Sequence, residues 1–311
     1  MSGPERSGGA ANQQLRVQAR PTPERSGGGG VAKWMRRLGW RHAVGIAAVA
    51  FSLFPIVFVV SAAFNPVGSL SSTELYPTGA STANFADLFG TTAFGRWYVN
   101  SVVIASIAAA AAVFLSVLAA YAFSRMRFAG RRVGLMALLL IQMFPQFLAV
   151  VTIYLIFAEI GDFYPAFGLD TPWGLMLLYL GGALGVNTWL MKGFLDTVPR
   201  ELDESAVMDG ATHAQTFFRI TLPLIAPILA VTALLGFIGT INEVLLANVF
   251  LRSDDSKTLA VGLYGLIAGQ RNANFGMFCA GSLLTAIPTV LVFQSLQRYI
   301  VSGLTAGAVK G

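Results

Sequence analysis

Charged residues and cysteines are scarce in this sequence of 311 residues. Only 12% of the residues are Asp, Glu, Lys or Arg, about half the share found in soluble globular domains. The single cysteine, Cys279, has no intrachain disulfide partner and lies in an apolar run, which predicts a buried packing thiol. Two histidines, His42 and His213, are too few for a histidine metal cluster, and the sequence supports no triad centred on them. None of the four lysines follows a glycine, which excludes the Gly-Lys of a phosphate-binding P-loop.

Long hydrophobic runs, by contrast, are abundant. Apolar residues make up 55% of the chain, and its mean hydropathy is +0.65. A bilayer core of about 30 Å needs roughly 20 apolar residues in a helix. Six segments meet this criterion: Ala43–Phe64, Ser101–Ser124, Val133–Phe157, Trp173–Leu195, Leu224–Leu251 and Phe278–Val301. The sequence therefore predicts an all-α membrane protein with six transmembrane helices.

The basic residues fall mostly on one side of these six segments. If the amino terminus is cytoplasmic, seventeen Lys and Arg residues lie on the cytoplasmic side and only four lie on the other, namely Arg96, Arg252, Lys257 and Arg271. Cytoplasmic loops carry such an excess, so both termini are expected in the cytoplasm. The same bias accounts for the net charge of +6, and no nucleic-acid partner is expected.

Composition divides the chain into three parts. Residues 1–40, which are rich in Gly, Ser, Pro, Gln and Arg, predict a disordered basic cytoplasmic tail. Residues 41–301 form the predicted transmembrane domain, in which the connection 196–223 separates the fourth and fifth spans. Residues 302–311 are expected to form a short cytoplasmic tail.

The 196–223 loop has the turn chemistry of two short helices. Pro199 precedes a helix-forming run with acids in its first turns, where the helix dipole favours negative charge. Asp209-Gly210 then predicts a sharp turn, because glycine accepts a positive φ. A second helical run is expected to end at Pro223, which lacks an amide hydrogen. Such an element either presents an apolar face and an acid to a partner or rests on lipid headgroups.

The loop resembles the signature loop of the membrane subunits of binding-protein-dependent ATP-binding-cassette importers. That signature starts with Glu-Ala-Ala, continues to a glycine and ends with Ile-x-Leu-Pro; here Ser205 replaces the first alanine. The matching residues are Glu204, Ala206, Asp209, Gly210, Ala211, Phe217, Ile220, Leu222, Pro223 and Pro227. KTLAVGLYGLIAGQ, from Lys257, and the carboxyl-terminal LQRYIVSGLTAGAVKG are similar to the maltose and maltodextrin branch (MalG-like), and the resemblance covers about residues 40–311.

The resemblance implies a type I importer permease (MetI-like) fold in a bacterial inner membrane. The implied partners are a second, related (MalF-like) permease subunit, two ATP-binding subunits, an extracytoplasmic sugar-binding protein and the lipid bilayer. Glu204 would pair with a basic side chain of an ATPase, while Gly210 would set the turn of the docked loop. No cofactor is expected in this chain, which is not itself an enzyme, since ATP and Mg²⁺ belong on the partner subunits. The 302–311 tail would reach towards the ATPases.

Five polar residues inside the predicted spans are candidate gate or pathway residues: Gln142, Gln146, Asn187, Asn242 and Glu243. An unpaired Glu243 would cost about 2.5–3.5 kcal/mol in the bilayer, so it is expected to face the bundle interior or a wet cavity. It either contacts the transport path or makes a helix-to-helix hydrogen bond worth roughly 0.6–2 kcal/mol. Gln142 and Gln146 flank Pro145, which predicts a kink in the third span.

Two other functional classes stay open on the residues alone. An ion-coupled secondary sugar transporter would use Glu243 as its carboxylate, although such proteins often contain inverted repeats and no clear repeat is visible. A structural or assembly subunit without a conduction role is the other class. The resemblance favours ATP-driven import of an oligosaccharide such as maltose, a maltodextrin or trehalose, and the sequence does not select among these sugars.

Overall fold

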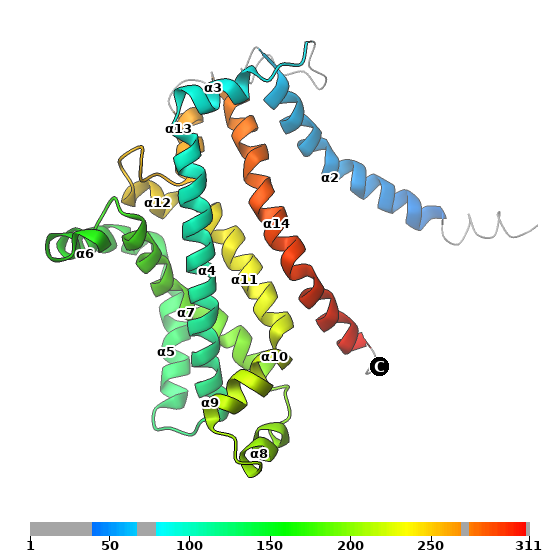
Figure 1. The fold of residues 1–311 in the computed structure, drawn as a ribbon, viewed down its shortest axis with the longest axis vertical. Coiled ribbons are helices and arrows are strands. Elements are labelled where there is room, and N and C mark those ends of the chain that lie inside the picture. Colours follow the sequence, from blue (N-terminus) through cyan, green and yellow to red (C-terminus); the bar gives the residue numbers. More distant parts are fainter. Residues whose placement is uncertain (1–38, 67–78, 269–273, 309–311) are drawn as a thin grey trace, which may run out of the picture. The chain divides into compact units, whose positions relative to one another are not determined.

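The computed structural model describes residues 39–66, 79–268 and 274–308, with the backbone alone at residues 146, 147, 183 and 301–308. Every regular element in these residues is a helix, as the sequence predicts (Figure 1). The expected tail 1–40 lies almost wholly outside the described residues, as do the last three residues. The chain forms two units, Met1–Phe54 and Pro55–Gly311, and all helices from α3 onward belong to the second.

Three described helices are long and apolar enough to cross a membrane by themselves. These are α2 (Trp40–Phe64), α4 (Phe94–Arg125) and the Phe275–Ile300 part of α14 (Phe275–Ala308). Three bent pairs also meet the criterion when each pair counts as one span: Arg131–Met143 with Leu148–Phe163 at 104°, Pro172–Gly182 with Leu184–Leu195 at 49°, and His213–Leu224 with Ala226–Ile241 at 76°. The described chain thus holds three to six spans, and each of the six expected segments falls on one of these helices or pairs.

The kink expected at Pro145 is present as a full break in the third span. α5 (Arg131–Met143) ends before it, and α6 (Gln146–Phe163) begins directly after it. A proline disfavours helical backbone in the preceding residue, and Phe144 is accordingly extended, with φ −74° and ψ 127°. The proline ring therefore turns the chain into a new direction.

The single fifth span expected over Leu224–Leu251 is wrong, because the structure divides it into α11 (Ala226–Ile241) and α12 (Leu245–Phe250). Side chains at the break bind the local backbone in place of the helical ladder. Asn242 Nδ2 donates to the Ile238 carbonyl at 2.8 Å, and a Glu243 carboxylate oxygen accepts the Leu246 amide at 2.8 Å. Such local bonds offer the chain an alternative to continued helix.

The carboxyl-terminal helix is longer than expected. α14 continues to Ala308, whereas the sixth span was expected to end at Val301, so the expected tail 302–311 is helical as far as it is described. No proline follows Pro288 in the sequence, and between Val301 and Ala308 only two glycines, Gly303 and Gly307, weaken the helix.

α4 is the central helix of the second unit and packs along α7 (Pro172–Leu195) and α11. Its buried face is rich in alanine, and small residues let neighbouring helix backbones approach closely. The remaining described helices are α3 (Ala83–Thr91), η3 (Pro165–Phe167) and α13 (Leu259–Ala268), together with the short helices of the 196–223 loop.

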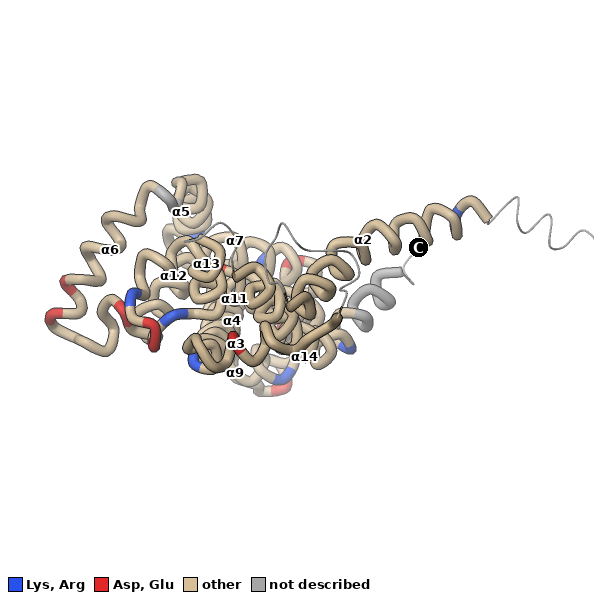
Figure 2. The backbone as a smooth tube through the Cα atoms, turned by 90° about the horizontal axis from the view of Figure 1, so that it is seen from above, with Lys and Arg blue, Asp and Glu red and all other residues tan. Residues whose placement is uncertain are grey.

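Charged residues gather in the connecting segments and at helix ends, and most of the helix length is free of them (Figure 2). In α4 no charged residue lies between Arg96, in the first turn, and Arg125, the last residue. Its 32 residues span about 48 Å, which exceeds a bilayer core of about 30 Å. Both ends of α4 therefore reach polar segments of the chain.

Candidate functional site

The 196–223 loop folds as the turn chemistry predicts. Its first helix, α8, spans Glu201–Met208, and Gly210 then adopts a left-handed backbone with φ +85°. The Ala211 amide donates to the Ala206 carbonyl at 2.9 Å, which closes the turn. In the second run, the Thr212 hydroxyl and the Gln215 side chain form a capping box at the start of α9 (His213–Thr216).

The second helical run continues one residue further than Pro223, its expected end. η4 (Phe217–Thr221) and α10 (Leu222–Leu224) extend it, and the chain turns at Ile225 instead. Pro223 lies in the first turn of α10, where a missing amide hydrogen is tolerated. The bend between this run and α11 is 76°.

One face of α8 is open and carries an acid between apolar side chains. Glu204 is exposed, and it shares this face with Val207, which is 48% exposed, and Met208, which is 87% exposed. Ala206 is buried against the protein, while Leu202 and Val207 are exposed. The exposed residues of α8 are thus free to meet a surface outside the described chain.

A neighbouring face of α8 is fixed to α4 by an ion pair that the sequence analysis missed. Arg125 Nε lies 2.7 Å from Asp203 Oδ2, and both side chains are largely buried. The Thr221 hydroxyl donates to the other carboxylate oxygen of Asp203 at 3.0 Å. The only signal in the sequence is an arginine at the end of the second span and a second acid beside Glu204.

The remaining signature residues support the loop from within. Phe217 is buried and stacks edge-on against Tyr121 of α4, with ring centroids 4.9 Å apart. Ala211, Ile220 and Leu222 are half-buried, whereas Asp209 and Pro223 are exposed. A pocket of about 720 Å³ opens between α8 and the end of α4, lined among others by Arg127, Glu204 and His213.

A second polar cluster secures the start of the loop. The Ser124 hydroxyl donates to Asp196 Oδ1 at 2.6 Å, and Lys192 Nζ lies 2.6 Å from Asp196 Oδ2. Burial raises the pKa of Asp196, but the hydrogen bonds from Lys192 and Ser124 and the charge of Lys192 lower it more, so the pKa lies below its ordinary value. Asp196 is therefore held ionised between α4 and α7.

Glu243, a candidate gate residue, makes three hydrogen bonds at the break between α11 and α12. Its carboxylate accepts the amides of Leu246 at 2.8 Å and Ala247 at 2.9 Å, which are donors of the first turn of α12. The Tyr179 hydroxyl of α7 donates to the same carboxylate at 2.8 Å. Glu243 therefore makes a helix-to-helix hydrogen bond to α7 and also caps α12.

The other candidate pathway residues lie on α5, α6 and α7. Gln142 Nε2 donates to the Gly182 carbonyl at 3.2 Å, at the point where α7 bends, and its side chain fills the space that a Cβ at Gly185 would need. Asn187 is half-buried on α7. Gln146 begins α6, and its side chain lies outside the described residues.

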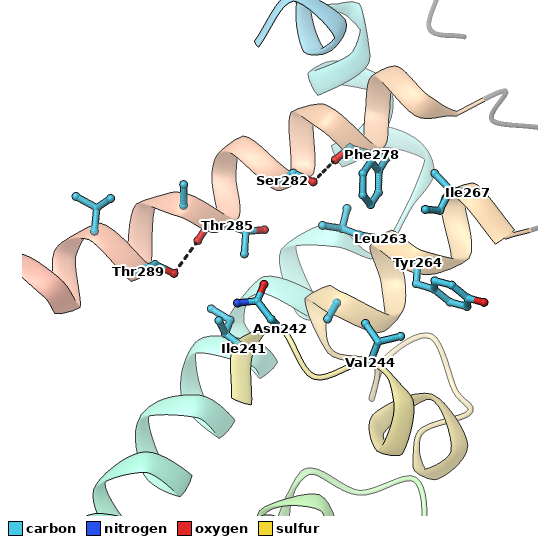
Figure 3. Close-up of a pocket in the computed structure, with 13 residues that line it drawn as sticks. Ile241, Asn242, Val244, Leu263, Tyr264, Ile267, Phe278, Ser282, Thr285 and Thr289 are labelled. Carbon is cyan, nitrogen blue, oxygen red and sulfur yellow. Dashed lines mark hydrogen bonds between the residues drawn. The ribbon is translucent and has the colours of Figure 1, made fainter. Parts of the chain in front are cut away.

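Asn242 alone among these candidates lines the pocket of about 480 Å³ between α11, α13 and α14 (Figure 3). Leu263 and Tyr264 of α13 face it, as do three hydroxyl-bearing residues of α14 (Figure 3). The hydroxyls of Ser282 and Thr285 each donate to a carbonyl one turn earlier in α14, at 2.8 Å. The pocket is therefore mainly apolar, with an amide and a phenol at its rim.

At the far end of α4, the 252–258 segment is held from two sides. Asn100 Nδ2 donates to the carbonyls of Asp255 at 2.8 Å and Lys257 at 3.1 Å, and Trp97 Nε1 donates to the Asp254 carbonyl at 2.8 Å. On the other side, the Asp170 carboxylate accepts hydrogen bonds from the Arg252 and Ser253 amides and from the Ser256 hydroxyl. These contacts make the segment a fixed part of the surface.

At this position Asp170 has a left-handed backbone, with φ +60°, which is unusual for a residue other than glycine. Burial raises the pKa of Asp170, but the hydrogen bonds from Ser256, Arg252 and Ser253 lower it more, so the pKa lies below its ordinary value. Within the described residues, no three His, Cys, Asp or Glu side chains are placed to hold one metal ion.

Comparison with known proteins finds a family and several close relatives. The family model described as "Binding-protein-dependent transport system inner membrane component" matches residues 112–305. The galactooligosaccharides transport system permease protein GanQ of Bacillus subtilis (strain 168) is 40% identical over 83% of this chain and 90% of its own length. The maltodextrin transport system permease protein MdxG of the same strain is 42% identical over 83% and 91%. The maltose/maltodextrin transport system permease protein MalG of Salmonella typhimurium (strain LT2) is 41% identical over 85% and 92%.

The fold is also found in a solved structure. A chain from the crystal structure of a bacterial ABC transporter involved in the import of the acidic polysaccharide alginate has a TM-score of 0.69 and 23% identity, covering 85% of this chain and 97% of that one. A chain from the alginate ABC transporter in complex with an alginate pentasaccharide-bound periplasmic protein has a TM-score of 0.61 and 18% identity. At these identities the likeness concerns the fold alone.

Proposed function

Because the chain belongs to the family of binding-protein-dependent transport system inner membrane components, we propose that it is a permease subunit of an ATP-driven oligosaccharide importer. It would form part of the translocation path in a bacterial cell membrane. The excess of basic residues in the tail and in the connections on one side supports cytoplasmic termini in this proposal.

The relatives support an oligosaccharide as the cargo. Three proteins about 40% identical to this chain over most of its length carry names that specify galactooligosaccharides, maltodextrin or maltose. Their common chemistry is a short chain of neutral hexoses. We therefore propose that class, without selecting one sugar, and expect an extracytoplasmic binding protein to deliver it.

The observation that carries the proposal is the open face of α8. Its exposed acid, Glu204, stands between the exposed apolar side chains of Val207 and Met208, and the turn at Gly210 fixes the direction of the helix. A protruding helix with this pattern suits a groove on a partner protein. In the proposal, each of two ATP-binding subunits carries ATP and Mg²⁺, one receives α8, and a second, related permease subunit completes the path.

An ion-coupled transporter, the alternative, receives no support from Glu243. A coupling carboxylate must exchange a proton or an ion during each cycle. The Glu243 carboxylate instead accepts three hydrogen bonds, two of which cap α12. Its geometry suits a structural role at the break between α11 and α12.

Reconstitution into liposomes tests the proposal. Uptake of a labelled maltodextrin or galactooligosaccharide should require ATP, the ATPase, the second permease subunit and the binding protein together. Glu204→Lys and Gly210→Pro should preserve membrane insertion and abolish uptake, because one reverses the charge on the docking face and the other forces φ to about −65° at a position that needs +85°.

Glu159→Lys is a matched control, since Glu159 is an exposed acid on α6, away from the loop, and the same charge reversal there should leave uptake unchanged. Uptake driven by an ion gradient with this chain alone would refute the importer proposal. Normal uptake in both loop variants would instead refute the docking role of α8.

A further inference from the structure

The ion pair between Arg125 and Asp203 is more buried than a typical surface pair. The two side chains are only 8% and 16% exposed, and neither Arg125 Nε nor Asp203 Oδ2 has another polar partner among the described residues. Arg125 also donates from its second terminal nitrogen to the Val198 carbonyl at 2.8 Å. Removing one partner of such a pair leaves the other charge buried and uncompensated, so the pair fixes α8 against the last turn of α4.

Further contacts join the two halves of the loop to the last turns of α4. Arg200, just before α8, donates to the Ser124 carbonyl at 2.9 Å. Phe217, beyond the Gly210 turn, packs its ring on Tyr121, one turn before Arg125. Thr221 links to the same ion pair through its hydrogen bond to Asp203. Both halves of the loop therefore contact the end of α4, although the loop is joined covalently to α7 and α11.

The other end of α4 is fixed to the 252–258 segment in a comparable way. The side chains of Trp97 and Asn100 donate to three carbonyls of that segment, and Arg96 forms an ion pair with Asp255. The Ser101 hydroxyl accepts the Leu259 amide at 2.6 Å in a buried position. Between these ends α4 is one continuous helix of 32 residues without proline.

We infer that Arg125 and Asp203 are positioning residues that make α4 a strut, which carries displacement of α8 over about 48 Å to the 252–258 segment. This inference rests on the proposed function, because only a docked ATPase would move α8. A continuous helix fixed at both ends moves as a rigid body, whereas α7 and the run into α11 bend by 49° and 76° on the way from the loop. The two routes along the chain, through α7 and through α11, should therefore transmit displacement less directly than α4 does.

The experiment follows α4 at its far end in the reconstituted importer complex. Cys279 is buried, so Asp254→Cys, at a side chain that is 72% exposed, supplies the one accessible thiol in the described residues. Its rate of labelling by a maleimide is measured with and without ATP. ATP should change this rate several-fold when Arg125 and Asp203 are intact, and Asp203→Asn should reduce the change to less than twofold.

Asp203→Asn keeps the size and the acceptor for Thr221 but removes the charge that Arg125 needs. Sugar-dependent stimulation of ATP hydrolysis should fall at least about tenfold, while the ATPase still co-purifies with the complex because the docking face with Glu204 is unchanged. Asp162→Asn, at an exposed acid of α6, is the matched control and should leave labelling and stimulation unaltered.

If the Asp203→Asn variant does not assemble into the importer complex, the double variant Arg125→Asp with Asp203→Arg, which exchanges the two charges, tests the inference instead. Recovered assembly together with an ATP-dependent labelling change supports the inference, and recovered assembly without that change overturns it. The inference is also overturned if ATP does not change the labelling rate at residue 254 when Arg125 and Asp203 are both intact. It is likewise overturned if the ATP-dependent change in labelling rate is the same in Asp203→Asn as in the Asp162→Asn control. Absence of ATP-dependent uptake in the complete complex would refute the proposed function instead.

Discussion

Replacing Glu243 should destabilise the second unit more than removing its cross-helix partner does. Glu243→Ala deletes two cap hydrogen bonds of α12, which costs about 0.5–2 kcal/mol. It also leaves the Tyr179 hydroxyl without its acceptor in a half-buried position, at a further cost of about 1–3 kcal/mol. Tyr179→Phe removes one hydrogen bond and leaves the cap in place, so it should cost about 0.6–2 kcal/mol.

The double variant Glu243→Ala with Tyr179→Phe should show that the stability effects of the two substitutions are coupled. In the double variant the unpaired hydroxyl is gone, so it should be at least as stable as Glu243→Ala alone, and the two single effects should not add. Tyr264→Phe is the matched control, because the Tyr264 side chain is 46% exposed and faces an open pocket. It should change stability by less than about 0.5 kcal/mol.

The assay is thermal unfolding of the purified complex in one detergent, followed by the loss of monodisperse protein on size exclusion at a fixed heating time. For a large domain, 1 kcal/mol corresponds to a shift of about 2–4 °C, so Glu243→Ala should lower the midpoint by about 3 °C or more. Equal midpoints for Glu243→Ala and Tyr179→Phe would show that the cap contributes nothing. An additive double variant would refute the coupling.

Two further predictions concern the far end of the bundle. A Cβ at Gly262 would overlap the Trp97 indole, which is held in place by its hydrogen bond to the Asp254 carbonyl. Gly262→Ala should therefore lower the stability by about 1–3 kcal/mol in the same assay. Gly265→Ala is the control and should cost little, because a Cβ at Gly265 would lie in open space. Asp170, whose pKa is lowered in the folded state, contributes stability that is present above its unfolded pKa of about 3.9 and is lost as the pH falls through the folded value. Asp170→Asn should therefore unfold at a lower temperature than the parent at pH 7, and the difference should shrink below about pH 4; a constant difference would contradict this account.

The loop shows what sequence can predict. The turn at Gly210 follows from local chemistry, because a positive φ favours glycine, and it is found at that residue. Pro145 is found at a helix break for a similar reason. Pro223 shows the limit of this reasoning: a proline is tolerated in the first turn of a helix as well as after its end, and only the packing of the loop on α4 and α7 places the turn at Ile225.

The residues that sequence reasoning missed depend on rotation about a helix axis. Asp203 and Glu204 are adjacent acids, and nothing local determines which of them turns towards Arg125. Likewise, the break at Asn242 lies within an apolar run of suitable length, and only the neighbouring Tyr179 and the amides of α12 show why Glu243 occupies it. Hydropathy predicts a span, but it does not reveal the polar contacts that interrupt one.

The contacts of α4 are far apart along the chain, which has a consequence for biosynthesis. The bond between Arg200 and Ser124 joins residues 76 apart, and that between Leu259 and Ser101 joins residues 158 apart. At about 5–20 residues per second, a ribosome needs about 4–15 s to supply the first partner and about 8–32 s to supply the second. During that interval the ends of α4 depend on interfacial water for their hydrogen bonds. Premature truncation between residues 200 and 259 would leave a nascent chain in which α4 is complete but lacks its bond between Ser101 and Leu259, a natural substrate for membrane quality control.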